Sequence, residues 1–130
     1  TSEEYIKFGC PGDKSVLEAA SSCWFNILHL HGQYPMMKEL ADYPVQAINW
    51  HDRTSNINLE MASRIFSGAL MGGIDQTHAL LDDCPDNVVD QACDAIRVMK
   101  GGKLILSPGC TYSLDVPEAN LDALRMSVAE

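Results

Sequence analysis

Residues 86–107 read DNVVDQACDAIRVMKGGKLILS, and this stretch decides the fold class. Asp86 is placed to cap a helix, and Gly101-Gly102 to end it. The apolar run at 103–107 then predicts a strand. The helix is predicted from apolar residues that recur on one face, namely Val88, Val89, Ala92, Ala95, Ile96 and Met99. A helix that leads closely into an apolar strand is the unit from which parallel α/β sheets are built.

The same alternation extends along the rest of the chain. We predict strands over 24–30, 45–50, 68–71 and 103–107, the first buried on most of both faces and the third running into a tight turn at Gly72 and Gly73. We predict helices over 13–22, 35–40, 58–65 and 77–81, from Asp86, and from Pro117. One helix followed by four successive βα units indicates an α/β fold, either an open doubly wound sheet or half of a (β/α)₈ TIM barrel. A complete barrel needs about 200 to 250 residues, and this sequence has 130.

Composition narrows the classes of partner. The formal net charge is −9, and the 9 Lys and Arg residues are scattered, so no basic stripe predicts binding to nucleic acid or to an anionic membrane. No apolar run approaches the roughly 20 residues that span a bilayer. The first ten residues, TSEEYIKFGC, do not resemble a signal peptide. We therefore expect a single domain that binds a small molecule.

The five cysteines indicate a reducing compartment. Their number is odd, their spacings are wide, and no CxxC pair occurs. A disulfide framework is not expected, and cytoplasmic localisation fits better. Most of these cysteines are predicted to be small buried hydrophobic residues, with Cys110 as the exception.

Reactive side chains gather where the predicted strands end. Because the carboxyl ends of parallel strands meet at one edge, ligands bind there in α/β folds. The residues concerned follow all four predicted strands in turn: His29 and His31; His51 and Asp52; Asp75, Gln76 and His78; Cys110 and Tyr112. Asp75 is expected to cap the next helix, and His78 to lie on the surface.

His29 and His31 are spaced i, i+2, so on a strand they point to the same side. Zinc takes imidazole and thiolate ligands, and a catalytic zinc usually keeps three protein ligands and one open position. Cys110, at another strand end, is the natural third ligand. The alternative is that the HxH pair binds nothing. His51 and Asp52 are candidates for substrate contact or for an ordinary loop hydrogen bond, and Tyr112 either faces substrate or packs its loop.

The chain resembles the C-terminal portion of the uroporphyrinogen decarboxylase superfamily, whose fold is a (β/α)₈ barrel with its active site at the C-terminal mouth. The resemblance spans most of the 130 residues and depends on the order and spacing of several segments. These are EEYIKFGCPGDKSVLE (3–18), NILHLHG (26–32), VQAINWHD (45–52), GALMGGIDQ (68–76) and LILSPGCTYSLDVPEANLDAL (104–124).

The superfamily has two branches with different chemistry. Metal-free decarboxylases of porphyrin biosynthesis bind their substrate through N-terminal arginines and an aspartate that this chain lacks, and they more often have Gly-His-Gly at the later turn. Corrinoid-linked methyltransferases hold zinc with a His-x-Cys-Gly motif and a later Pro-Gly-Cys turn, and activate a thiol. Here residues 29–32 (HLHG) and 107–110 (SPGC) occupy those places. The resemblance thus implies Zn²⁺ held by His29, His31 and Cys110, with His51, Asp52 and Tyr112 as catalytic candidates.

One residue departs from the methyltransferase pattern. His31 stands where that branch has cysteine, which removes one negative charge from the metal shell and makes a bound thiolate less nucleophilic. Room is therefore left for a different reaction, for the metal-free decarboxylase, or for a non-catalytic α/β ligand-binding module.

The resemblance also bears on the extent of the protein. It implies that residues 1–130 are the C-terminal half of a barrel and a fragment of a longer enzyme. Alone, such a fragment is expected to be inactive and to form homo-oligomers through its exposed strand edges. A corrinoid protein is a possible partner of the parent enzyme.

Overall fold

The helix and strand that decide the fold class form as their sequence predicts. In the computed structural model, which describes residues 1–128, helix α5 covers Pro85–Met99 and strand β4 covers Leu104–Pro108. The helix buries one stripe of apolar side chains, Val88, Ala92, Ala95 and Met99. Its N-cap is Cys84 rather than Asp86, because Pro85 already occupies the first turn, where its missing N–H costs nothing. Gly101, with φ of +80°, follows the helix end.

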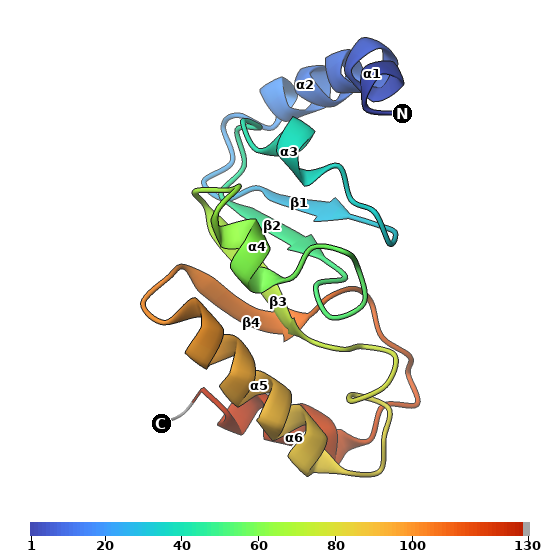
Figure 1. Cartoon of the computed structure of the whole chain (residues 1–130), viewed down its shortest axis with the longest axis vertical. Helices are drawn as coiled ribbons and strands as arrows, with labels where there is room; N and C mark the ends of the chain where they lie inside the picture. Colours follow the sequence, from blue (N-terminus) through green and yellow to red (C-terminus); the bar gives the residue numbers. More distant parts are fainter. Residues whose placement is uncertain (129–130) are drawn as a thin grey trace.

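Four parallel strands form one sheet in the order β1-β2-β3-β4. Each strand leads into a helix, so the chain contains the four successive βα units of the predicted α/β fold. The strands are β1 (Ile27–Leu30), β2 (Ala47–Trp50), β3 (Ala69–Ile74) and β4. The helices that follow the strands are α3 (Met37–Leu40), α4 (Leu59–Ser63), α5 and α6 (Glu118–Met126). The sheet is an open one, and β1 and β4 are its edges (Figure 1).

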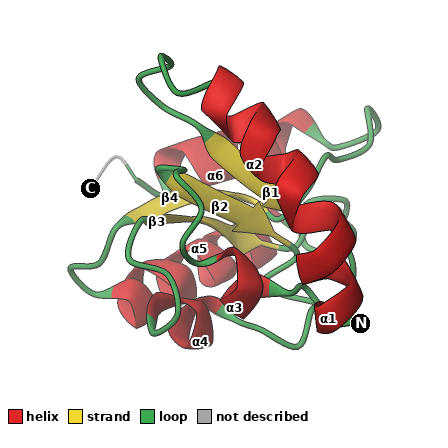
Figure 2. Ribbon diagram, turned by 90° about the horizontal axis from the view of Figure 1, so that it is seen from above, coloured by secondary structure: helices red, strands yellow, loops and turns green. Residues whose placement is uncertain are grey.

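One face of the sheet carries the core. Leu30, Ile48, Trp50 and Leu70 point to this face and are buried against α3, α4 and α5. Figure 2 shows these three helices gathered on the same side of the strands. The opposite face includes Ile27, which is 49% exposed, and the exposed His29. This arrangement corresponds to one section of an α/β barrel wall, with its helix layer outside and its inner face open.

The N-terminal segment is more helical than predicted. Instead of one helix over 13–22, a short helix α1 (Ser2–Glu4) continues through a π-helical turn η1 (Tyr5–Gly9) into α2 (Cys10–Ala19). These elements lie at the end of the molecule next to β1, as Figure 1 shows. The side chain of Thr1 and that of Glu4 cap each other's backbone N–H groups, which starts the helix before the first predicted position.

Three further predictions from the sequence are wrong. The first strand begins at Ile27 rather than Trp24, and Trp24 is 90% exposed, because β1 is an edge strand whose inner face is open. Strand β3 runs through Gly72 and Gly73 without turning. Residues 77–81 form turns and not a helix, although the Asp75 carboxylate accepts hydrogen bonds from the backbone N–H groups of residues 77 and 78 as a helix cap would.

The cysteines are less buried than expected. Cys23, Cys84 and Cys93 are exposed, while Cys10 and Cys110 are half-buried. Within residues 1–128, none of the helices has the length and apolar character required to cross a membrane.

Candidate metal centre

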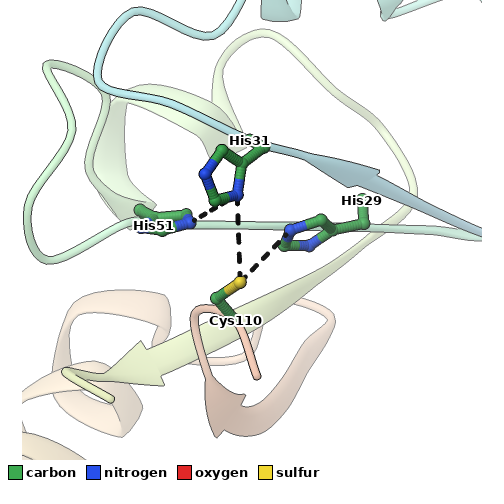
Figure 3. Close-up of side chains that lie close together, drawn as sticks. All are labelled: His29, His31, His51 and Cys110. Carbon is green, nitrogen blue, oxygen red and sulfur yellow. Dashed lines mark hydrogen bonds between the residues drawn. The ribbon is translucent and has the colours of Figure 1, made fainter. Parts of the chain in front are cut away.

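Four potential metal ligands from three strand ends meet on the open face of the sheet. His29 lies in β1 and His31 just beyond it, His51 follows β2, and Cys110 follows β4. One ligand atom from each side chain lies within 4.8 Å of the others. Figure 3 shows the three rings and the sulfur pointing toward a common centre. The structure therefore brings His29, His31 and Cys110 together, and adds His51.

Part of the donor spacing agrees with a tetrahedral zinc site. A tetrahedral zinc with bonds of about 2.05 Å to nitrogen and about 2.3 Å to sulfur separates two nitrogens by about 3.3 Å and nitrogen from sulfur by about 3.6 Å. His51 Nε2 lies 3.3 Å from His31 Nδ1, and Cys110 Sγ lies 3.5 Å from His29 Nε2. Cys110 Sγ is 4.0 Å from His31 Nδ1. Two of these distances suit a tetrahedral metal ion, and the wider ones, up to 4.8 Å in the cluster, would have to shorten on binding.

The turn that carries Cys110 depends on a glycine. A Cβ atom on Gly109 would lie 2.7 Å from the carbonyl oxygen of Trp50 and 3.1 Å from Cα of His51. The Gly109 N–H also donates to the carbonyl of Ile74. The Pro-Gly-Cys turn can therefore press against the end of β2, which places the sulfur beside the histidines.

Asn49 orients the His29 ring. The two residues are direct partners in the register of β1 and β2, so their side chains share a face. The Asn49 amide nitrogen donates to the carbonyls of Met71 and Pro108, and its oxygen therefore faces His29 Nδ1 at 2.6 Å. His29 Nδ1 must carry the proton, which leaves the Nε2 lone pair directed at Cys110.

The surroundings of His51 favour its neutral form. Burial lowers the pKa of its imidazole, and the nearby His31 and His29 rings lower it further. A neutral ring offers a nitrogen lone pair to a metal ion, whereas a protonated ring cannot. Its Nδ1 lies 3.2 Å from the side-chain nitrogen of Gln76, which follows β3 and is buried.

Asp52, predicted to act in catalysis, lies away from this cluster. Its carboxylate accepts a hydrogen bond of 3.0 Å from the N–H of Gly73 and borders a cavity of about 110 Å³ beside α4 and α5. Burial raises the pKa of Asp52 to about 6, although the Gly73 hydrogen bond and the Arg53 guanidinium oppose the shift. Asp52 thus belongs to the packing between the sheet and its helices.

Tyr112, the other catalytic candidate, lies in the loop after β4. Its side chain is 47% exposed. His78, in the loop after β3, is also exposed, and its ring pairs with Asp75 at 2.9 Å. These two side chains border the same sheet edge without joining the cluster.

Sequence reasoning missed Asn49, and it placed Gln76 at a strand end without giving it a role. Both are amides within or directly after apolar strands, where a buried polar side chain needs a hydrogen-bond partner. The sequence NW at 49–50 carried that signal. The register that places Asn49 opposite His29 was needed to interpret it.

Comparison with known proteins identifies the family. The profile of the family described as Uroporphyrinogen decarboxylase (URO-D) matches residues 1–130, and the chain therefore belongs to that family. Its fold is similar to that of a methyltransferase from Methanosarcina mazei, with a TM-score of 0.78 and 21% sequence identity. That similarity covers 98% of this chain and 36% of the methyltransferase, so the chain spans little more than a third of its neighbour. Among curated proteins, none matches the sequence.

Proposed function

We propose that this chain carries the metal centre of a zinc-dependent methyltransferase-type enzyme. The observation that carries the proposal is the convergence of His29, His31, His51 and Cys110, whose ligand atoms lie within 4.8 Å of one another. The methyltransferase of similar fold supports the same class. We propose a small thiol, or a methyl group delivered by a corrinoid protein, as the substrate.

The residues of the site have distinct tasks in this proposal. His29, His31 and Cys110 hold the ion, and His51 is placed to give a fourth donor. When bound, zinc acts as a Lewis acid that lowers the pKa of a coordinated thiol or water. With three neutral imidazoles and one thiolate, the site keeps a net positive charge, which favours an anionic sulfur ligand. Tyr112 and the exposed side of His51 are proposed to contact substrate, and Asp52 to support the strand end from behind.

Metal analysis tests the proposal directly. The chain, purified without an affinity tag, is expected to hold about one equivalent of zinc, and His29→Ala and Cys110→Ala are expected to lose it. Cys93→Ala is the matched control, because Cys93 is exposed on α5 away from the cluster. Zinc content near zero in the wild-type chain, unchanged in Cys110→Ala, contradicts the proposal.

The metal-free decarboxylase is the second candidate, and the family match favours it. That reaction acts on a porphyrinogen with several carboxylates, so it needs cationic side chains at the mouth of the barrel. The cluster of three imidazoles and a thiol supplies no fixed cation. Decarboxylation of a porphyrinogen by the parent enzyme, undiminished in Cys110→Ala and without bound metal, would establish this alternative.

We propose further that residues 1–130 are the C-terminal half of a barrel and act only with the missing walls. The chain spans 36% of the methyltransferase to which its fold is similar. On this proposal the isolated chain binds metal but does not turn over substrate, and its open strand edges pair with a second copy. A free thiolate ligand suits a reducing compartment such as the cytoplasm.

A further inference from the structure

The two amides beside the metal centre hold their histidines differently. Asn49 faces His29, and Gln76 faces His51, in each case at the ring nitrogen Nδ1. The Asn49 amide nitrogen already donates to two backbone carbonyls, at 2.9 and 3.1 Å. Rotating that amide would break both bonds and set its nitrogen against the proton of His29. His29 is therefore fixed as the tautomer whose Nε2 can bind metal.

Gln76 is not fixed in this way. Its side-chain nitrogen lies 3.2 Å from His51 Nδ1, and within residues 1–128 its amide makes no second side-chain hydrogen bond. In this orientation Gln76 donates to Nδ1, so the His51 proton sits on Nε2 and is shared with His31 Nδ1 at 3.3 Å. A ring in this state cannot use Nε2 as a metal ligand.

Rotation of the Gln76 amide by half a turn gives the other state. Its oxygen then accepts the proton of His51 Nδ1, and the Nε2 lone pair becomes free to bind metal. Because a primary amide presents a donor on one side and an acceptor on the other, Gln76 can satisfy His51 both bound and released. A carboxylate could satisfy only the tautomer that is protonated on Nδ1.

We propose that Gln76 is a positioning residue that makes His51 the exchangeable ligand of the metal centre, while His29, His31 and Cys110 stay bound. The inference rests on the proposed function. On substrate entry the thiol sulfur would take the coordination position that His51 Nε2 leaves. The thiol proton would pass to His51 Nε2, and the proton on Nδ1 would pass to solvent, so that the released ring stays neutral. Gln76 turns its NH₂ group toward Nδ1 as the ring is released.

Cobalt(II) and 2-mercaptoethanol are suitable probes, because cobalt reports its ligands by absorption and each sulfur ligand adds a charge-transfer band. His29→Ala and Cys110→Ala are expected to weaken cobalt binding about 100-fold, and His51→Ala only about tenfold. In His51→Ala the thiol should bind about tenfold more tightly, because it no longer competes with the ring. Gln76→Glu should raise the affinity for cobalt about tenfold and lower the affinity for the thiol about tenfold. The reason is that a carboxylate holds His51 in the tautomer that binds metal.

Gln91→Glu is the matched control for the added charge. Gln91 accepts a hydrogen bond from the Asp75 N–H through its side-chain oxygen and makes no contact with His51. The Gln91→Glu variant should therefore bind cobalt and 2-mercaptoethanol with wild-type affinity. Equal loss of cobalt in His51→Ala and His29→Ala, or equal effects of Gln76→Glu and Gln91→Glu, would overturn the inference alone. A wild-type chain that binds no cobalt would overturn the proposed function as well.

Discussion

Asn49 and His29 lie directly opposite each other in neighbouring parallel strands, and a hydrogen bond of 2.6 Å joins the Asn49 oxygen to His29 Nδ1. The same amide donates to carbonyls of Met71 in β3 and Pro108 in β4. One buried side chain thus connects all four strands at the edge where the metal ligands lie. This makes Asn49 a determinant of both the sheet and the site.

Replacing Asn49 with alanine is expected to weaken zinc binding about 10- to 100-fold, because His29 loses the partner that fixes its tautomer. The loss of the two bonds to backbone carbonyls should also destabilise the fold by about 1 to 3 kcal/mol. Competition with a zinc chelator measures the first effect, and urea unfolding measures the second.

Asn120→Ala is the matched control for this variant. Asn120 is fully buried and likewise donates to two backbone carbonyls, those of Leu80 and Asp82, but it contacts no histidine. It should lose a similar amount of stability and keep the zinc affinity of the wild type. If both variants lowered the zinc affinity equally, the effect of replacing Asn49 would come from a general loss of stability.

The convergence of three ligands could be predicted from sequence, but the rest of the site could not. His29, His31 and Cys110 follow apolar runs, and the ends of parallel strands lie at one edge whatever the details of packing. Whether His51 joins the cluster depends on the direction in which the chain leaves β2. The two amides depend on strand register and on a loop contact, which no local pattern encodes.

Asp52 is expected to make stability fall as pH rises. Its pKa is about 6 in the folded chain and 3.8 in an unstructured peptide, so between these values the folded state binds more protons than the unfolded state. The free energy of unfolding therefore decreases from about pH 4 to about pH 6, by up to about 3 kcal/mol from this group. In Asp52→Asn, which keeps an oxygen to accept from Gly73, this dependence should disappear.

Asp94→Asn is the control, because Asp94 should affect the pH dependence of stability in the opposite direction. A hydrogen bond from Arg53 lowers the pKa of Asp94, so this carboxylate stabilises the fold above its unfolded pKa and loses that effect as pH falls. Urea unfolding at pH 4, 5, 6 and 7 compares both variants with the wild type. A wild-type minus Asp52→Asn difference that stays constant across this range would contradict the buried-carboxylate interpretation.

Gly73 is expected to tolerate no side chain. It has φ of +110°, and a Cβ atom there would lie 2.8 Å from Cβ of Ala95 in α5. Gly73→Ala should therefore cost about 2 to 4 kcal/mol from backbone strain and crowding together. In Gly101→Ala, where φ is +80° and no atom lies within 4 Å, only the strain remains, about 1 to 2 kcal/mol. Urea unfolding of the two variants separates the cost of backbone strain from the cost of contact with α5. Equal losses of stability in the two variants would exclude a role for that contact.

Gly73 also shows which part of the fold could not be predicted from the sequence. The periodic apolar positions of α5 and the apolar runs of the four strands are local signals, and the predicted α/β order follows from them. A Gly-Gly pair is locally a turn signal, yet Gly72 and Gly73 serve close approaches: a Cβ on Gly72 would lie 2.5 Å from the Asp52 carboxylate. Such contacts between distant segments decide that β3 continues.

The open edge of β1 is expected to mediate self-association. Ile27 is 49% exposed at this edge, and the backbone groups along the outer side of β1 have no strand partner among residues 1–128. Pairing with a second copy would satisfy those groups and bury apolar surface.

Sedimentation velocity should therefore detect a dimer at micromolar concentration. Ile27→Lys should shift the chain toward monomer, because a charge at a pairing edge opposes association. Val16→Lys, in helix α2, should leave the dimer intact, since Val16 is 69% exposed and belongs to no strand. A wild-type chain that stays monomeric at all concentrations, or equal effects of the two lysines, would mean that the edge does not pair with a second copy.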